Sequence, residues 1–391
     1  MNNISSYERY QRQMILKEFG EAAQQKLLQA KVIVIGAGGL GCPALQYMAA
    51  AGVGTIGIAD HDTVALNNLQ RQVLYTVNDV GESKAEKAAS RLQELNPDIE
   101  IIPYNVRLIP QNTLSFVKAF DIIIDGTDNF STRYMINDAC VLLNKPLVYG
   151  AVSQYEGQVA VFNYRQNEGD TAVNYRDLFP QPPKDDEVLN CEEAGVLGIL
   201  PGIIGTMMAN ETIKIITGIG EPLINQLLTY NALNNQVYQV SLFAGKETRS
   251  LIPESEAAFT QTDYEWLCAS SSRNPIAPDS PDSYRDRDGF EIDIENFNTL
   301  LTSDDITVID VREPGEIPVV NEFIFERIPL SQLKENLAGI KSNTVVFFCQ
   351  TGKRSLQAAQ WLFDTFGKTK NIYSLQGGIL QWKKFQKKQT T

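Results

Sequence analysis

The sequence predicts an α/β protein made of two successive units, a larger doubly wound one and a smaller one. Short apolar runs alternate with helix-like stretches over residues 1–253, and the same alternation returns over residues 289–391. Such alternation is typical of mostly parallel sheets that carry helices on both faces. Residues 254–288 are rich in Ser, Pro and Asp, which predicts a linker between two domains.

The first unit begins its sheet with Lys31–Ile35, a short run of Val and Ile that is typical of a buried strand. A glycine-rich turn and a helix to Ala51 follow it. Further strands are expected at 55–60, 100–104, 121–125, 146–151 and 158–164. A helix to about Leu143 is expected between the strands 121–125 and 146–151. After a helix near 202–218, the runs 226–231 and 236–242 predict an antiparallel extension of the sheet.

The second unit repeats the pattern on a smaller scale. Strands are expected at Ile306–Asp310, Thr344–Cys349 and Asn371–Leu375, with a helix over Ser355–Phe366. These elements form a second α/β pattern.

Composition narrows the classes of function. Among 391 residues, 34 are Lys or Arg and 47 are Asp or Glu, so a net charge of −13 disfavours binding to nucleic acid. The N-terminal residues show no signal-peptide pattern, and no uninterrupted apolar run has membrane-spanning length. The five cysteines are scattered without a CxxC pair, so we expect reduced thiols and a cytoplasmic protein. Cys42 and Cys140 fall within predicted helices and are expected in the core.

A glycine-rich turn, Gly36–Gly41, follows the first strand and opens a helix. Glycines permit a tight turn and close approach of the backbone to a phosphate, and a helix N-terminus favours negative charge. Asp60 ends the second strand, where an acid that binds ribose belongs. These features fit NAD and ATP equally well.

The residues that follow favour a triphosphate. Arg71 and Lys84 carry charge that neutralises phosphates, and Asp128, just past a strand end, can hold a hard cation such as Mg²⁺. A hydride-transfer site has no need of this set. Each of them taken singly has a plainer interpretation as a surface charge, and His61 reads as a bystander that packs or faces solvent.

The ordered motifs from Tyr7 to about Pro253 resemble a family of adenylating enzymes. That family includes molybdopterin-synthase adenylyltransferase, the adenylyltransferase of the thiazole-pathway sulfur carrier and the ubiquitin-activating enzymes. The resemblance rests on these segments: Arg9–Gln13, Gly36–Gly41, Asp60–Asp62, Asn67–Gln72, Lys84, Thr127–Phe130 and Cys191–Val196. It implies a Rossmann-like fold for this part of the chain.

The resemblance also implies roles for single residues. Gly39 and Asp60 would hold the nucleoside, Lys84 would steady the α-phosphate and Asp128 would bind Mg²⁺. Arg12 would reach into the neighbouring subunit's site, which makes a homodimer part of the mechanism. The full set implied to bind ATP is Gly36, Gly38, Gly39, Gly41, Asp60, Asp62, Asn68, Arg71, Lys84, Asp128, Asn129 and Arg12.

The chain departs from this family at two cysteine positions. Many relatives hold a structural zinc with two CxxC pairs, but here the first pair's positions are Asn174 and Asp177, and Cys268 stands alone. We therefore predict no zinc and expect packing or hydrogen bonds to hold the region. Cys191 matches a cysteine that in relatives bonds to the carrier or accepts sulfur, and its alternative interpretation is an ordinary small residue at a crossover.

A second constellation, Cys349–Ser355, joins a strand to a helix. Backbone N–H groups and nearby cations at a helix N-terminus stabilise an anion on sulfur. With Asp310–Glu313 upstream and Leu375–Ile379 downstream, residues 289–386 resemble a rhodanese, which implies that Cys349 carries a persulfide. The segment Val319–Leu330 lacks the histidine that rhodaneses usually carry. The resemblance therefore does not define the conformation of this loop or the way in which a sulfur donor docks.

Together the two resemblances imply ATP-dependent activation of a carboxylate followed by sulfur transfer. The substrate would be the terminal Gly-Gly of a small ubiquitin-like sulfur carrier, with a sulfur donor such as a cysteine desulfurase, and the product a thiocarboxylate. A carrier of molybdopterin synthesis is the first expectation and the thiazole carrier of thiamine synthesis the alternative. A nicotinamide-dependent dehydrogenase and a non-catalytic scaffold for a ubiquitin-like partner are the rivals of other classes.

Overall fold

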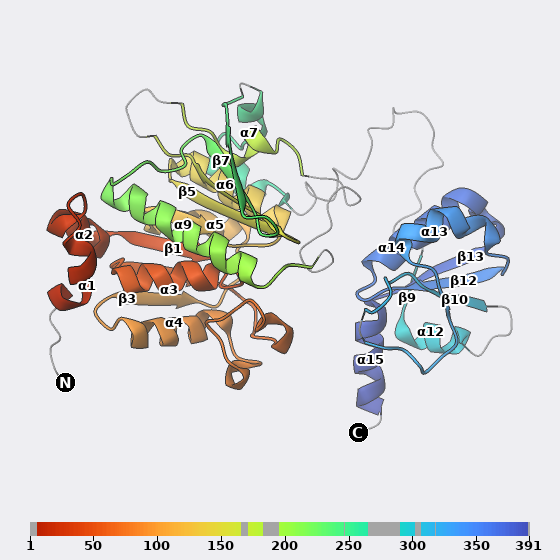
Figure 1. The fold of residues 1–391 in the computed structure, drawn as a ribbon. Coiled ribbons are helices and arrows are strands. Elements are labelled where there is room, and N and C mark those ends of the chain that lie inside the picture. Colours follow the sequence, from red (N-terminus) through yellow and green to blue (C-terminus); the bar gives the residue numbers. More distant parts are fainter. Residues whose placement is uncertain are drawn as a thin grey trace. The chain divides into compact units, whose positions relative to one another are not determined.

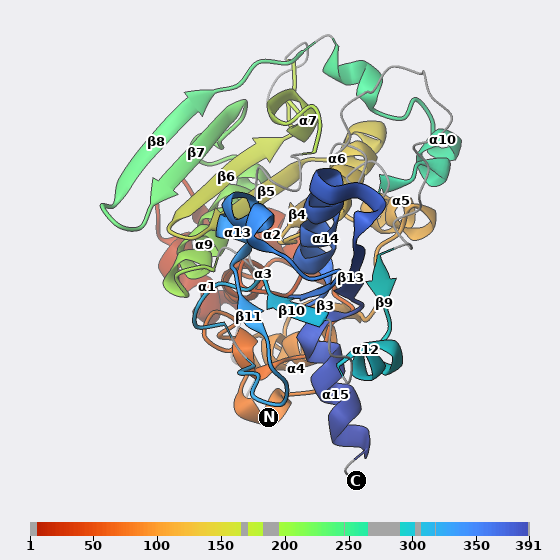
Figure 2. The same cartoon turned by 90° about the vertical axis from the view of Figure 1, so that its right-hand side faces the viewer.

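The computed structural model describes residues 6–165, 171–182, 195–245, 247–264, 290–301, 306–316 and 318–389. The chain divides into two compact units, Met1–Ile276 and Ala277–Thr391, which Figures 1 and 2 draw from two sides. Each unit has a sheet and a core of its own.

The first unit is built on an eight-stranded sheet with the order β3-β2-β1-β4-β5-β6-β7-β8. Its strands are β1 (Lys31–Ile35), β2 (Thr55–Ala59), β3 (Glu100–Tyr104), β4 (Ile122–Asp125), β5 (Leu147–Ser153), β6 (Glu156–Phe162), β7 (Gln226–Asn231) and β8 (Gln236–Ser241). Strands β1 to β5 pair in parallel, and β6 to β8 continue antiparallel. The predicted doubly wound sheet with an antiparallel extension is confirmed.

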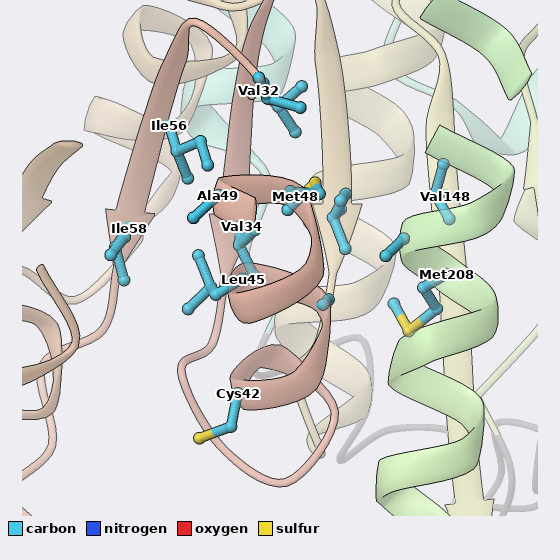
Figure 3. Close-up of a cluster of buried hydrophobic side chains, with 14 of the residues drawn as sticks. Val32, Val34, Cys42, Leu45, Met48, Ala49, Ile56, Ile58, Val148 and Met208 are labelled. Atoms are coloured by element: carbon cyan, nitrogen blue, oxygen red, sulfur yellow. The ribbon is translucent and has the colours of Figure 1, made fainter. Parts of the chain in front are cut away.

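Helices cover both faces of this sheet (Figure 1). They are α1 (Ser6–Met14), α2 (Gly20–Gln29), α3 (Gly41–Ala51), α4 (Lys84–Leu95), α5 (Pro110–Ala119), α6 (Phe130–Leu143), α7 (Tyr175–Leu178), α9 (Ile199–Thr217) and α10 (Glu256–Gln261), with short 3-10 helices at Leu66–Asn68, Val77–Asp79 and Thr248–Leu251. Because side chains alternate along a strand, Val32 and Val34 of β1 face α3, α4 and α9, whereas Ile33 and Ile35 face α5 and α6. Figure 3 shows the first of these clusters, with Cys42 inside it as predicted.

Helix α9 is long and apolar enough to cross a membrane by length and composition alone. In the structure it packs on the sheet, and two strand glycines permit the close approach. A Cβ on Gly150 would lie 2.3 Å from the Met208 sulfur, and one on Gly157 would lie 2.3 Å from Ile204. Two charged side chains of α9 form an ion pair, with Lys214 Nζ 2.6 Å from a carboxylate oxygen of Glu211. These contacts account for the apolar composition of α9 as that of a core helix.

The beginning of the expected linker belongs to the first unit. Residues 256–261 form α10, which packs against α5 and α6, and Phe259 and Tyr264 are buried in the same core. Composition missed this because the helix has one turn and a half and follows a polar cap at Ser255. The rest of the expected linker, 265–288, lies outside the described residues.

The second unit holds a five-stranded sheet with the order β11-β10-β12-β13-β9, parallel throughout. Its elements are β9 (Glu291–Ile292), α12 (Ile294–Leu300), β10 (Ile306–Asp310), β11 (Glu326–Arg327), α13 (Leu330–Asn336), β12 (Thr344–Phe348), α14 (Lys353–Phe366), β13 (Asn371–Leu375) and α15 (Gly378–Gln389), with 3-10 turns at Leu337–Gly339 and Gly367–Thr369. Helices α13 and α14 cover one face, and α12 and α15 cover the other. The expected smaller α/β unit is confirmed, with two two-residue strands that no sequence pattern indicates.

Candidate functional site

The glycine-rich turn meets a second loop at the point where the sheet order reverses. Strands β1 and β4 are neighbours, and the turns that leave them touch at their carboxyl ends, which is where open parallel sheets bind ligands. Gly36 has φ +93°, and a Cβ there would lie 2.8 Å from the Gly126 carbonyl oxygen. A Cβ on Gly41 would lie 2.0 Å from the Gly36 carbonyl oxygen. Both positions therefore require glycine for backbone packing.

A cavity of about 1270 Å³ opens at this edge of the sheet. The structure brings most of the predicted residues to its wall: Gly36, Gly38, Gly39, Asp60, Asp62, Arg71, Lys84, Asp128 and Asn129. They come from the turns after β1, β2 and β4 and from the start of α4. Its volume exceeds the range of about 300–1,000 Å³ that is usual for small-molecule sites.

Three predicted residues are not among those that line the cavity. Gly41 begins α3 beneath the turn, where it serves packing. Asn68 ends a 3-10 turn, and its side-chain oxygen accepts a hydrogen bond of 3.3 Å from the N–H of Ala65. Arg12 lies exposed in the last turn of α1.

One lysine supplies buried positive charge to the cavity. The Lys84 side chain is only 8% exposed, and its Nζ lies 2.9 Å from an Asp62 carboxylate oxygen. Asp60 accepts hydrogen bonds of 2.8 Å from the N–H groups of Ala37 and Asp62, so it fixes the glycine turn. Burial raises the pKa of the Asp60 carboxyl, although the Lys84 ammonium opposes the shift.

Among the described residues, Asp60, His61 and Asp62 form a group whose potential ligand atoms lie within 4.8 Å of one another. Both Asp60 oxygens already accept backbone N–H groups. His61 is exposed and lies 3.7 Å from Asp62, in keeping with the solvent-facing role expected for it. Asp128, on the opposite loop, presents an exposed carboxylate to the same cavity.

The sequence interpretation missed a buried charged pair beside Asp128. Arg133 of α6 lies with its Nε 3.3 Å from the Asp125 carboxylate, and Asp125 is fully buried at the end of β4. Arg133 also lines the cavity, together with Tyr149 of β5. One signal was present: Arg133 and Asp138 are the charged residues of an otherwise uncharged helix.

Hydrogen bonds hold the region where relatives have the first cysteine pair. The Asn174 backbone and side-chain N–H groups donate to an Asp177 carboxylate oxygen at 2.8 and 2.7 Å. The other Asp177 oxygen accepts from the Gly245 N–H at 2.9 Å and from the Thr248 hydroxyl. The absence of zinc stays a prediction, because Cys268 lies outside the described residues, as does Cys191.

A second buried pair secures the same region. Arg176 donates two hydrogen bonds, of 2.8 and 2.7 Å, to the carboxylate of Asp138 on α6. The Tyr264 hydroxyl donates to the same carboxylate at 3.0 Å. Asp138 is fully buried and Arg176 is 3% exposed. Side chains from α6, α7 and the segment after α10 thus meet at one carboxylate.

In the second unit, Cys349 lies at the carboxyl end of the central strand β12 with its side chain buried. The Gly352 N–H donates to the Cys349 sulfur at 3.1 Å, and the Ser355 hydroxyl lies 3.6 Å from it. The Ser374 hydroxyl in turn donates to Ser355 at 2.9 Å. Of the predicted cradle of backbone N–H groups, the Gly352 N–H at the start of α14 donates to the thiol, a placement that suits a negative charge on sulfur.

One ion pair and one carboxylate shared by two arginines lie near this loop. Arg354 donates to both oxygens of Glu316 at 2.6 and 2.7 Å, so the positive charge expected next to the thiol is balanced by an acid. Behind the loop, the fully buried Asp310 is bonded by Arg312 at 2.8 Å and by Arg327 at 3.0 Å. Arg327 comes from the segment that lacks the usual histidine.

Comparison with known proteins fits this geometry. The ThiF family model matches residues 10–251, and the Rhodanese-like domain model matches residues 293–385. "Probable adenylyltransferase/sulfurtransferase MoeZ" of Mycobacterium tuberculosis is 40% identical over 380 residues, which cover 96% of this chain and 92% of that protein. "Sulfur carrier protein adenylyltransferase" of Thermus thermophilus is 52% identical over 226 residues, covering 58% of this chain and 83% of that protein.

Among solved structures, E. coli MccB with ATP has a TM-score of 0.54 at 22% identity, over 63% of this chain and 74% of that one. This likeness supports the fold of the first unit. The two family models match the two units in the order in which they occur in the chain. The Mycobacterium tuberculosis relative spans both units. The chain therefore belongs to the ThiF family, in the form that carries a C-terminal rhodanese-like domain, and is an adenylyltransferase and sulfurtransferase.

Proposed function

We propose that the first unit uses ATP to adenylylate the C-terminal Gly-Gly carboxylate of a small ubiquitin-like sulfur-carrier protein, and that the second unit supplies persulfide sulfur to it. The observation that carries the proposal is one cavity in which a glycine turn, a buried cation and an exposed acid meet. The sulfur-carrier substrate named for the Thermus thermophilus relative supports the choice of substrate.

In the first step a carboxylate oxygen of the carrier attacks the α-phosphate of ATP, and pyrophosphate leaves. The resulting acyl adenylate has a leaving group that the free carboxylate lacks. Lys84 and Arg71 are proposed to stabilise the phosphate charge, and Gly39 and Asp60 to hold the nucleoside. Their placement on the cavity wall supports these roles. Gly36, Gly38, Asp62 and Asn129 are proposed to complete the site.

Mg²⁺ is proposed to join the substrate at Asp128. Magnesium is usually held by one or two carboxylates together with substrate phosphates and water, and an exposed carboxylate on the cavity wall fits that requirement. The ion would supply positive charge to the phosphates. Asp128 itself would orient the phosphate chain relative to Lys84 on the opposite wall.

In the second step the Cys349 thiolate takes the outer sulfur of a donor persulfide, and the donor's thiolate leaves. The persulfide of Cys349 then attacks the acyl carbon of the adenylate and displaces AMP. The N–H of Gly352 and the Ser355 hydroxyl are suited to stabilise the sulfur anion between the two steps. The product of that attack is an acyl persulfide bonded to Cys349. We propose that the Cys191 thiolate attacks the Cys349 sulfur, which releases the thiocarboxylate and leaves a Cys349–Cys191 disulfide, and that an external thiol then reduces this disulfide.

The remaining partners follow from the same proposal. A cysteine desulfurase is the proposed donor, and a homodimer would allow the exposed Arg12 to serve the neighbouring site. We propose a cytoplasmic location, domain limits near 1–253 and 289–391, and neither nucleic acid nor membrane as a partner. A carrier of molybdopterin synthesis is the first candidate, and the thiazole carrier is the second. Family membership removes the dehydrogenase alternative.

The decisive experiment measures exchange of labelled pyrophosphate into ATP in the presence of each candidate carrier. Asp128→Ala should abolish the exchange, whereas Cys349→Ala should preserve it and stop thiocarboxylate formation. Each variant controls for the other, because they lie in different units. Equal loss of exchange in both variants would contradict the division of labour, and no exchange with any carrier would favour the scaffold alternative.

A further inference from the structure

We propose that Arg133 is a positioning residue for the adenylation step, which fixes the backbone of the loop that carries Asp128. The inference rests on the proposed role of Asp128 as the Mg²⁺ ligand. It assigns the placement of that ligand to a buried guanidinium on the next helix.

Thr127, the residue before Asp128, is held from both sides. Its N–H and its hydroxyl donate to one oxygen of Asp125 at 3.0 and 2.6 Å. Its carbonyl oxygen accepts from Arg133 Nη2 at 2.7 Å. On the far side of Asp128, the Asn129 side chain accepts from the N–H of Thr132 at 2.8 Å and caps α6. The exposed Asp128 therefore sits on a backbone that its neighbours hold in place.

Arg133 extends this clamp to the adjacent strand. The same Nη2 lies 3.4 Å from the carbonyl oxygen of Gly150 on β5, and the guanidinium carbon lies 4.9 Å from the centre of the Tyr149 ring. One side chain from α6 thus joins the loop after β4 to strand β5, and it lines the cavity.

Arg133 forms an ion pair with Asp125 but directs its hydrogen bonds to other atoms. Arg133 Nε and Asp125 Oδ2 lie 3.3 Å apart as an ion pair, yet neither atom makes a hydrogen bond to any described residue. Arg133 gives its short hydrogen bond to the loop carbonyl instead. Asp125 balances the buried charge, and Nη2 of the guanidinium holds the backbone.

Lysine cannot replace arginine in this arrangement. A guanidinium presents several donors in a rigid plane, whereas an ammonium donates from one point. In Arg133 the Nε atom faces Asp125, while Nη2 reaches the carbonyl oxygens of Thr127 and Gly150. Arg133→Lys would keep a charge near Asp125 but would have a single nitrogen to serve both the carboxylate and the two carbonyl oxygens. We therefore expect the loop that carries Asp128 to lose its fixed position, while the charge of Asp125 remains neutralised.

The test measures equilibrium binding of the α,β-methylene analogue of ATP to the full-length protein by calorimetry, with and without Mg²⁺. The wild-type protein should bind more tightly with Mg²⁺. Arg133→Lys should lose most of that gain, roughly tenfold in affinity or more, which is about the contribution of one charge-assisted hydrogen bond. Its affinity without Mg²⁺ should stay within about twofold of wild type.

Arg176→Lys is the matched control, because Arg176 is an equally buried arginine paired with a carboxylate and does not line the cavity. It should lower the melting temperature and keep the Mg²⁺ gain. If it loses the gain as Arg133→Lys does, the effect is general destabilisation and the inference is overturned. Thr127→Val, which removes one bond of the clamp and no charge, should lose part of the gain and covers the case in which Arg133→Lys does not fold.

Asp128→Ala separates this inference from the function on which it rests. If that variant keeps the Mg²⁺ gain, the proposed metal role fails and the positioning role fails with it. If Asp128→Ala loses the gain while Arg133→Lys and Thr127→Val keep it, the metal role stands and the positioning role alone is overturned.

Discussion

Replacing Gly41 by alanine tests whether backbone packing beneath the glycine turn controls the adenylation site. The added Cβ would lie 2.0 Å from the Gly36 carbonyl oxygen. Ordinary contact begins at 3.4 Å, so the start of α3 and the turn must separate by the difference, about 1.4 Å. No flexible side chain can relieve the overlap, because the opposing atom belongs to the backbone.

A displacement of this size should greatly reduce the rate of adenylation and should lower the free energy of unfolding only moderately. A misplacement of 1 Å reduces catalysis by about a hundredfold, and an overpacked methyl group costs about 1–3 kcal/mol of unfolding free energy. We therefore expect Gly41→Ala to lower carrier-dependent pyrophosphate exchange at least about a hundredfold, in a protein that remains folded by calorimetry. The same variant should retain sulfur transfer by the second unit.

Gly202→Ala is the matched control. Gly202 lies in α9, and an added Cβ there meets nothing within 4 Å. Alanine favours a helix over glycine by roughly 0.5–1 kcal/mol, so this variant should be slightly more stable and equally active. The reasoning is refuted if Gly41→Ala exchanges pyrophosphate within threefold of wild type (roughly the limit of context effects), or if Gly202→Ala loses activity to the same extent.

Three further predictions concern charges and thiols. Arg176→Ala leaves the fully buried Asp138 carboxylate unpaired and should cost about 3–5 kcal/mol in denaturant unfolding; a loss below about 1 kcal/mol would contradict this. Burial would raise the pKa of Glu316, but the hydrogen bonds from Arg354 outweigh it and lower the pKa. The unfolded state then binds more protons, so stability should fall as pH drops below about 4.5, and Glu316→Gln should flatten that slope. Burial raises the pKa of the Cys42 thiol to about 12, so iodoacetamide at mildly alkaline pH should not modify it in the folded protein, as mass spectrometry can check.

The glycine turn, Lys84 and Asp128 are predictable together because each follows a recognisable strand or opens a helix. Once the strands are known to be parallel, their carboxyl ends meet at one edge, and residues distant in the sequence share one cavity. The same reasoning placed Cys349 at the end of β12. For these positions, local pattern and the rule for parallel sheets are sufficient.

The partners in the ion pairs were not predictable in this way. Arg133 pairs with Asp125 across a loop, Arg176 pairs with Asp138 on another helix, and Arg354 pairs with Glu316 from a distant segment. Which carboxylate meets which guanidinium depends on how strands and helices pack in three dimensions, and a sequence pattern contains no such distance. The two-residue strands β9 and β11 were missed because a period of two needs more residues to become visible.

The bond from Tyr264 to Asp138 decides where the protein can be cut. A truncation at residue 253 would strip away Phe259 and Tyr264, open the core beneath α10 and leave Asp138 one donor short. A truncation just after Tyr264 keeps the whole first core closed, and the carrier-activating half should then work as a separate reagent.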